Sequence, residues 1–171
     1  MTGSMADESF RYILDELKKD FQKIGYRKNR YFFKKNTNRN VAIVGFQRSV
    51  NSTKNVILFT VNLAVVCRKL ADPETDDISK LGISDAHLRQ RLGAFVSHPT
   101  DKWWELSPDV DVNAVLHEIA ALIFPKAIPY LESFLDNQKL IQLWEAGRSP
   151  GLTDSQRRRF LTELKQREAL V

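Results

Sequence analysis

Between Asp20 and Asp72 the chain has no aspartate or glutamate. The same stretch, residues 21–71, carries eleven lysines and arginines, so the rest of the chain holds 15 basic against 21 acidic residues. A protein built in this way projects positive potential from one part of its surface while the remainder is acidic. The asymmetry predicts either a negatively charged partner or a solubilising surface, and charge alone does not distinguish the two.

Cysteine, clustered histidine and long apolar runs are also scarce. Cys67 is the only cysteine, which excludes an intrachain disulfide and predicts a buried small hydrophobe. The three histidines are scattered and no glycine-rich phosphate loop is present, so neither a metal nor a cofactor is expected. No apolar stretch approaches the ~20 residues of a membrane span, and no secretory signal is visible. These features predict a cytoplasmic protein without membrane contact.

At 171 residues the chain suits one domain. Three- and four-residue apolar spacing predicts a helix over residues 7–24, and β-branched or aromatic runs predict strands near 30–35, 41–49 and 56–66. Residues 72–80 form an acidic loop. Residues 87–92 fit a strand or a helix, and the following glycine favours a strand, with another short strand over 102–106. Helices then follow, so we expect an α+β fold: an N-terminal helix, an antiparallel sheet of about five strands, and C-terminal helices on one face.

The C-terminal part divides at a glycine- and proline-containing break. We predict a single domain over residues 6–146, a linker over 147–153, and an appended helix over 154–171. Thr153 and Gln156 have the spacing of a capping box before this helix. The break matches the Gly-x-Ser-x-Gly string of hydrolases, but Pro150 lacks the N–H that an oxyanion hole would need there, so an interhelical turn is expected.

Cations interleaved with aromatic residues mark a first candidate binding region. Arg27, Lys28 and Arg30 precede an aromatic strand, a mixture that suits phosphate contacts and base stacking, although cations also protect edge strands from pairing. In a strand over 87–92, His87, Arg89 and Arg91 share one face, where two arginines could grip a carboxylate or phosphate, or pair with helix acids. Of Trp103 and Trp104, alternation sends one ring into the core and the other outward.

Five motifs in order resemble a bacterial family known as domain of unknown function 4304. They are Gly25-Tyr26-Arg27-Lys28 leading into Tyr31-Phe32-Phe33, Gly45-Phe46-Gln47-Arg48-Ser49, Phe59-Thr60-Val61-Asn62-Leu63, Arg89-Gln90-Arg91-Leu92-Gly93 and Asp101-Lys102-Trp103-Trp104. The resemblance covers about residues 8–140 and implies a compact α+β fold with no established activity, so no catalytic residue can be transferred. Gln47, Asn62, Arg91 and Trp104 are members of these motifs that could meet as a binding patch or as a structural polar network.

Three functions remain open from the sequence. The first is a non-enzymatic binding protein that engages an acidic protein partner through the basic sheet region, with Arg48 among the contacts, for example as an immunity or antitoxin-like protein. The second is nucleic-acid binding by the same basic, aromatic strands. The third is a small enzyme with a pocket near His87 and Trp104. The absence of a catalytic constellation favours a non-enzymatic role, and the oligomeric state is not indicated.

Overall fold

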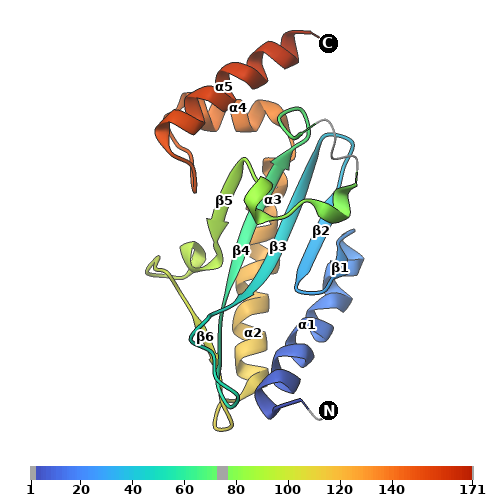
Figure 1. The fold of residues 1–171 in the computed structure, drawn as a ribbon, viewed down its shortest axis with the longest axis vertical. Coiled ribbons are helices and arrows are strands. Elements are labelled where there is room, and N and C mark those ends of the chain that lie inside the picture. Colours follow the sequence, from blue (N-terminus) through green and yellow to red (C-terminus); the bar gives the residue numbers. More distant parts are fainter. Residues whose placement is uncertain (1–2, 73–76, 171) are drawn as a thin grey trace.

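A computed structural model describes residues 3–72 and 77–170. Residues 73–76 of the predicted acidic loop lie outside the described residues. The order of elements is one helix, four strands, two further short strands, and then a group of helices (Figure 1). The α+β class predicted from the sequence is confirmed.

The first helix, α1 (Met5–Lys23), forms because its apolar residues recur on one side. Phe10, Leu14 and Phe21 belong to this stripe and are buried against the sheet. Ser4 caps the first turn by accepting a hydrogen bond from the Asp7 amide at 3.2 Å. Gly25 follows the helix with φ of +88°, a left-handed conformation that ends helices and favours glycine.

In the described part of the chain, six antiparallel strands form one sheet. The order is β1-β2-β3-β4-β5, with β6 pairing with the first residues of β4. The strands are β1 (Arg27–Asn29), β2 (Phe32–Asn36), β3 (Asn40–Arg48), β4 (Ile57–Cys67), β5 (Leu88–Arg91) and β6 (Trp104–Leu106). The run predicted as one strand over 30–35 is split, because Arg30 turns the chain with φ of +53°. Residues 88–91 form the strand that the sequence favoured.

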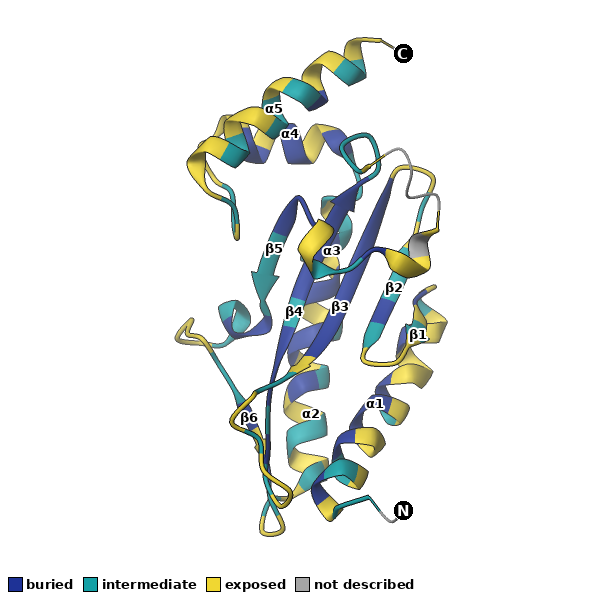
Figure 2. Cartoon of the chain, in the orientation of Figure 1, coloured by how far each residue is buried: buried dark blue, intermediate teal, exposed yellow. Residues whose placement is uncertain are grey.

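One face of the sheet is covered by helices. The alternate residues of β4 that point to it, from Ile57 to Val65, are fully buried beneath α1, α2 (Val112–Leu122) and α3 (Ile128–Ser133). Figure 2 shows β3 and β4 as the most buried elements in front of these helices. The opposite face is the more open one. Residues 77–86 cross it and cover Ile43 and Ala64 with Leu81 and Ala86 (Figure 1).

The helical stretch that follows the sheet departs from α-helical geometry at Pro125, as expected for a proline inside a helix. A π-helical turn, η4 (Ile123–Ala127), carries the chain from α2 into α3. Proline lacks an N–H and clashes with the carbonyl four residues earlier, and the wider turn accommodates both defects. By length and composition alone, Val112–Ser133 is a candidate membrane span, but core helices pass the same test, and here Ile119 and Leu131 are buried in the core beneath the sheet.

The last two helices pack across the end of the sheet. They are α4 (Asn137–Glu145) and α5 (Asp154–Ala169), and the capping box of Thr153 and Gln156 is present as predicted. Trp144 of α4 and Leu164 of α5 are fully buried, and the Trp144 and Phe160 rings lie 6.2 Å apart. The helix that the sequence separated from the domain therefore shares apolar surface with α4.

Candidate functional site

The positive charge of residues 21–71 is partly neutralised by acids from distant parts of the chain. Each pair joins a cation of this stretch to a helix carboxylate: Lys28–Asp15 at 2.9 Å, Lys35–Glu132 at 2.9 Å, Arg48–Asp7 at 2.8 Å and Lys69–Glu168 at 3.0 Å. These pairs are at least partly exposed, so each contributes little to stability. Part of the positive charge in this stretch is therefore offset by carboxylates of distant helices.

The open face of the sheet holds a groove of about 760 Å³. Its centre is a row of residues on four neighbouring strands, because Phe32 pairs with Gly45, Gly45 with Asn62, and Asn62 with Arg91. Ile83 borders the groove on one side, and Tyr31 and Arg48 border it elsewhere. Among the residues that the structure describes, the lining includes three arginines and no aspartate or glutamate. The groove therefore combines an apolar floor with positive charge.

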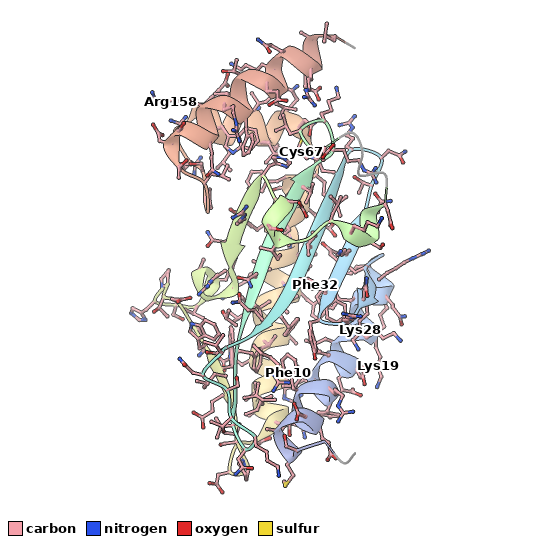
Figure 3. The ribbon with its side chains drawn as sticks, in the orientation of Figure 1. Phe10, Lys19, Lys28, Phe32, Cys67 and Arg158 are labelled. Carbon is pink, nitrogen blue, oxygen red and sulfur yellow. The ribbon has the colours of Figure 1, made fainter. Side chains whose placement is uncertain are left out.

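Gly45 gives the floor of the groove its shape. A Cβ atom at this position would lie 2.9 Å from the Phe32 ring, so the ring can cross Gly45 only because the side chain is missing. Figure 3 shows Phe32 in the middle part of the sheet. Glycine inside a strand often marks such a close approach, and this was the signal in the sequence that could have identified the floor.

Two arginines on β5 point to the open face but are held in different directions. Arg89 donates from Nη2 to the carbonyl oxygen of Ser84 at 2.9 Å, while its Nε is buried without a partner within the described structure. Arg91 donates from Nη1 to Asp101 and lies 5.5 Å from the centre of the Trp103 ring. The hydrogen bond from Arg91 lowers the pKa of Asp101. The two guanidinium groups thus form two positions of positive charge.

An amide pair lies between the floor and the arginines. Asn62 donates from Nδ2 to Oε1 of Gln47 at 2.8 Å, and both residues line the groove. This bond uses the nitrogen of one amide and the oxygen of the other. Asn62 Oδ1 and Gln47 Nε2 therefore present one acceptor and one donor, which match the two polar groups of a peptide unit.

The turn before α5 contributes a wall of the groove. The Arg89 amide donates to the carbonyl oxygen of Pro150 at 3.1 Å, and Gly151 lines the cavity. A Cβ atom on Gly151 would lie only 2.5 Å from Cβ of Arg89. Residues 147–153, which the sequence presented as a linker, therefore contact the edge of β5. Neither Gly151 nor Ile83 had been identified as a site residue, because their contacts arise only in the tertiary structure.

The structure does not bring together all the site residues that the sequence suggested. Gln47, Arg48, Asn62, Arg89 and Arg91 line the groove. Arg27 and Lys28 border a separate depression of about 520 Å³ beside β1, and Arg30 lines a neighbouring one. The basic segment near β1 and the arginines of β5 are therefore two regions.

Trp104 does not join the groove. It is 3% exposed and its ring lies 6.0 Å from the Phe59 ring on the helix-covered face, whereas Trp103 is partly exposed. His87 lies by the other end of β4, where its Nδ1 accepts a hydrogen bond from the Cys67 amide at 3.0 Å. Phe59 and Cys67 are separated by roughly 27 Å along an extended strand. The hypothesis of one pocket near both His87 and Trp104 is therefore wrong.

Cys67, His87 and Asn137 have the residue types of a thiol-protease triad but not its chemistry. All three are buried, and Figure 3 shows Cys67 at the end of β4 that meets α4. The Cys67 thiol donates to Asn137 Oδ1 at 3.4 Å, and burial raises the pKa of Cys67 to about 11. Burial lowers the pKa of His87 to about 4. A neutral, enclosed thiol is a poor nucleophile, so this cluster has a structural role.

In residues 3–72 and 77–170 no group of three or more histidines, cysteines and acids is placed to hold a metal ion. Comparison with known proteins gives one result. The family model described as Domain of unknown function (DUF4304) matches residues 17–133. No curated protein and no solved structure matches the chain. The matched region includes the groove floor and both β5 arginines, and it ends before the turn that contains Gly151.

Proposed function

Because the chain belongs to the DUF4304 family, whose description assigns no activity, we propose a function from the groove itself: the protein binds an acidic segment of another protein on the open face of its sheet. The observation that carries this proposal is the composition of the lining, which within residues 3–72 and 77–170 has Arg48, Arg89 and Arg91 and no acidic side chain. Arg48 and Arg91 also pair with Asp7 and Asp101, which lie outside the lining. Complementary charge guides association and disfavours other partners.

The polar groups of the groove favour binding over catalysis. Gln47 and Asn62 carry neutral amides, and arginine remains protonated at all ordinary pH values. Such groups hold a ligand by hydrogen bonds, and they do not exchange protons with it near neutral pH. The arginines supply planar donors that suit a carboxylate.

A protein partner is also favoured over nucleic acid by the state of the aromatic rings. Phe32 lies across Gly45 and has the Lys34 ammonium 5.7 Å from its ring centre, while Tyr31 lies 5.6 Å from the Phe10 ring. Binding of single strands relies on ring faces that accept stacked bases. The Phe32 ring is packed against Gly45 in this way, whereas Tyr31 is 42% exposed, so the preference for a protein partner depends on Phe32.

Affinity capture with matched variants tests the proposal. The tagged protein is incubated with extract of its source cells, and captured proteins are identified at low and moderate salt. Arg89→Gln/Arg91→Gln removes two charges from the groove, and Arg27→Gln/Arg30→Gln removes two charges beside β1 as the control. We expect a stoichiometric acidic protein that the control retains and the groove variant loses. The proposal would be contradicted if only the control variant lost the captured protein, or if only nucleic acid were captured.

A further inference from the structure

The spacing of the β5 arginines carries more information than their charge. Arg89 and Arg91 are two residues apart on one strand and pair with Ala64 and Asn62, so their side chains leave the sheet on the same face. Alternate residues of a strand are roughly 7 Å apart. Contacts with Ser84 and Asp101 keep the guanidinium groups apart. The arrangement suits two separate anions better than one anion held by both arginines.

We infer that the groove recognises an extended peptide segment in which two acidic residues alternate with another residue. Side chains at alternate positions of an extended chain lie on one side at the same roughly 7 Å spacing. Carboxylates at these positions can each meet one arginine of β5. This inference rests on the proposed function, because it specifies the segment that the partner presents.

The rest of the groove fits the backbone of such a segment. Asn62 Oδ1 and Gln47 Nε2 can pair with the N–H and C=O of one peptide unit. Phe32, Gly45 and Ile83 give an apolar floor for the residue between the acids.

The ion pair of Arg91 with Asp101 does not block this role. Asp101 accepts from Nη1, and a guanidinium group has five N–H donors in a planar fork. The side chain of Asp101 is 61% exposed, so the pair is a weak surface interaction. A second carboxylate can therefore bind the same guanidinium group.

Two synthetic peptides of identical composition test the inference. One has the core Ser-Glu-Ser-Glu-Ser and the other Ser-Glu-Glu-Ser-Ser, each with a fluorescent label, and fluorescence anisotropy at low salt gives their affinities. We expect the alternating peptide to bind about two- to fivefold more tightly, as the loss of one exposed ion pair would give. Arg89→Gln and Arg91→Gln should each remove this preference. Arg158→Gln on α5, a control outside the groove, should retain it.

The outcomes separate the inference from the proposed function. Equal affinity of the two peptides, lost together in the arginine variants, would overturn the alternating pattern and leave the acidic partner in place. Tighter binding of oligothymidylate than of either peptide, dependent on both arginines, would overturn the choice of a peptide ligand. Binding of neither peptide, together with no groove-dependent capture from extract, would overturn both.

Discussion

Replacing Gly151 with alanine should detach the turn before α5 from β5, and Gly147→Ala provides a matched control. Gly151 and Gly147 have nearly the same φ, +75° and +76°, in the left-handed region. A Cβ on Gly147 would meet nothing within 4 Å, whereas one on Gly151 would lie 2.5 Å from Cβ and 3.0 Å from the carbonyl oxygen of Arg89. The two substitutions therefore share their backbone strain and differ in the steric clash.

The expected losses in the free energy of unfolding follow from the backbone strain and the steric clash. The left-handed conformation destabilises the folded state by about 1–2 kcal/mol when the residue is alanine. Alanine also reduces the conformational entropy of the unfolded chain, which stabilises both variants by about 0.4–1 kcal/mol. Gly147→Ala should therefore reduce the free energy of unfolding by about 1 kcal/mol. Gly151→Ala adds a clash with backbone that cannot rotate away, for which about 1–3 kcal/mol is typical. Its total cost should be about 2–4 kcal/mol.

Two measurements check this prediction. Denaturant unfolding gives the difference in free energy between the variants. Hydrogen exchange of the Arg89 amide reports its bond to Pro150, which should open in Gly151→Ala and persist in Gly147→Ala. Equal costs for the two variants, or full protection of the Arg89 amide in Gly151→Ala, would refute the contact between the turn and β5.

Two further predictions concern the end of the sheet. Because burial lowers the pKa of His87 from 6.5 to about 4, the unfolded chain binds a proton that the folded chain does not, and stability should fall by up to about 3 kcal/mol as the pH decreases from about 6.5 to about 4. His87→Gln should flatten this dependence in unfolding curves recorded across that range; an unchanged slope would argue against a buried neutral imidazole. Deleting residues 148–171 should leave a cooperative unfolding transition with a loss of about 3–5 kcal/mol, because the buried Leu164 is removed and Phe160 no longer packs near Trp144. A molten or insoluble product would instead make α5 part of the folding core.

Much of the fold was predictable because its signals are local. The stripe that includes Phe10 and Leu14 defines α1, the alternation from Ile57 to Val65 defines β4, and the spacing of Thr153 and Gln156 defines the start of α5. Each pattern repeats with the period of its own secondary structure, so it can be recognised without knowledge of the neighbouring elements.

The candidate site was predictable only in part. The alternation of side chains along a strand predicted that Arg89 and Arg91 share one face. It also predicted that only one of the two adjacent tryptophans points into the core. The register of β6 decides that the buried ring is Trp104, because this residue pairs with Phe59 above the helices. Alternation along one strand could not show that Trp104 and Gln47 lie on opposite faces of the sheet, because this depends on how the strands pair.

The sequence by itself determined the elements, their order and the concentration of positive charge, since these depend on neighbours along the chain. Only the tertiary structure decided that acids of distant helices neutralise much of this charge, as in the pair of Arg48 with Asp7. It alone aligned Phe32, Gly45, Asn62 and Arg91 across four strands and placed Gly151 against β5. These contacts join residues that are far apart in the chain, and their formation depends on strand register and helix packing, for which no local period exists.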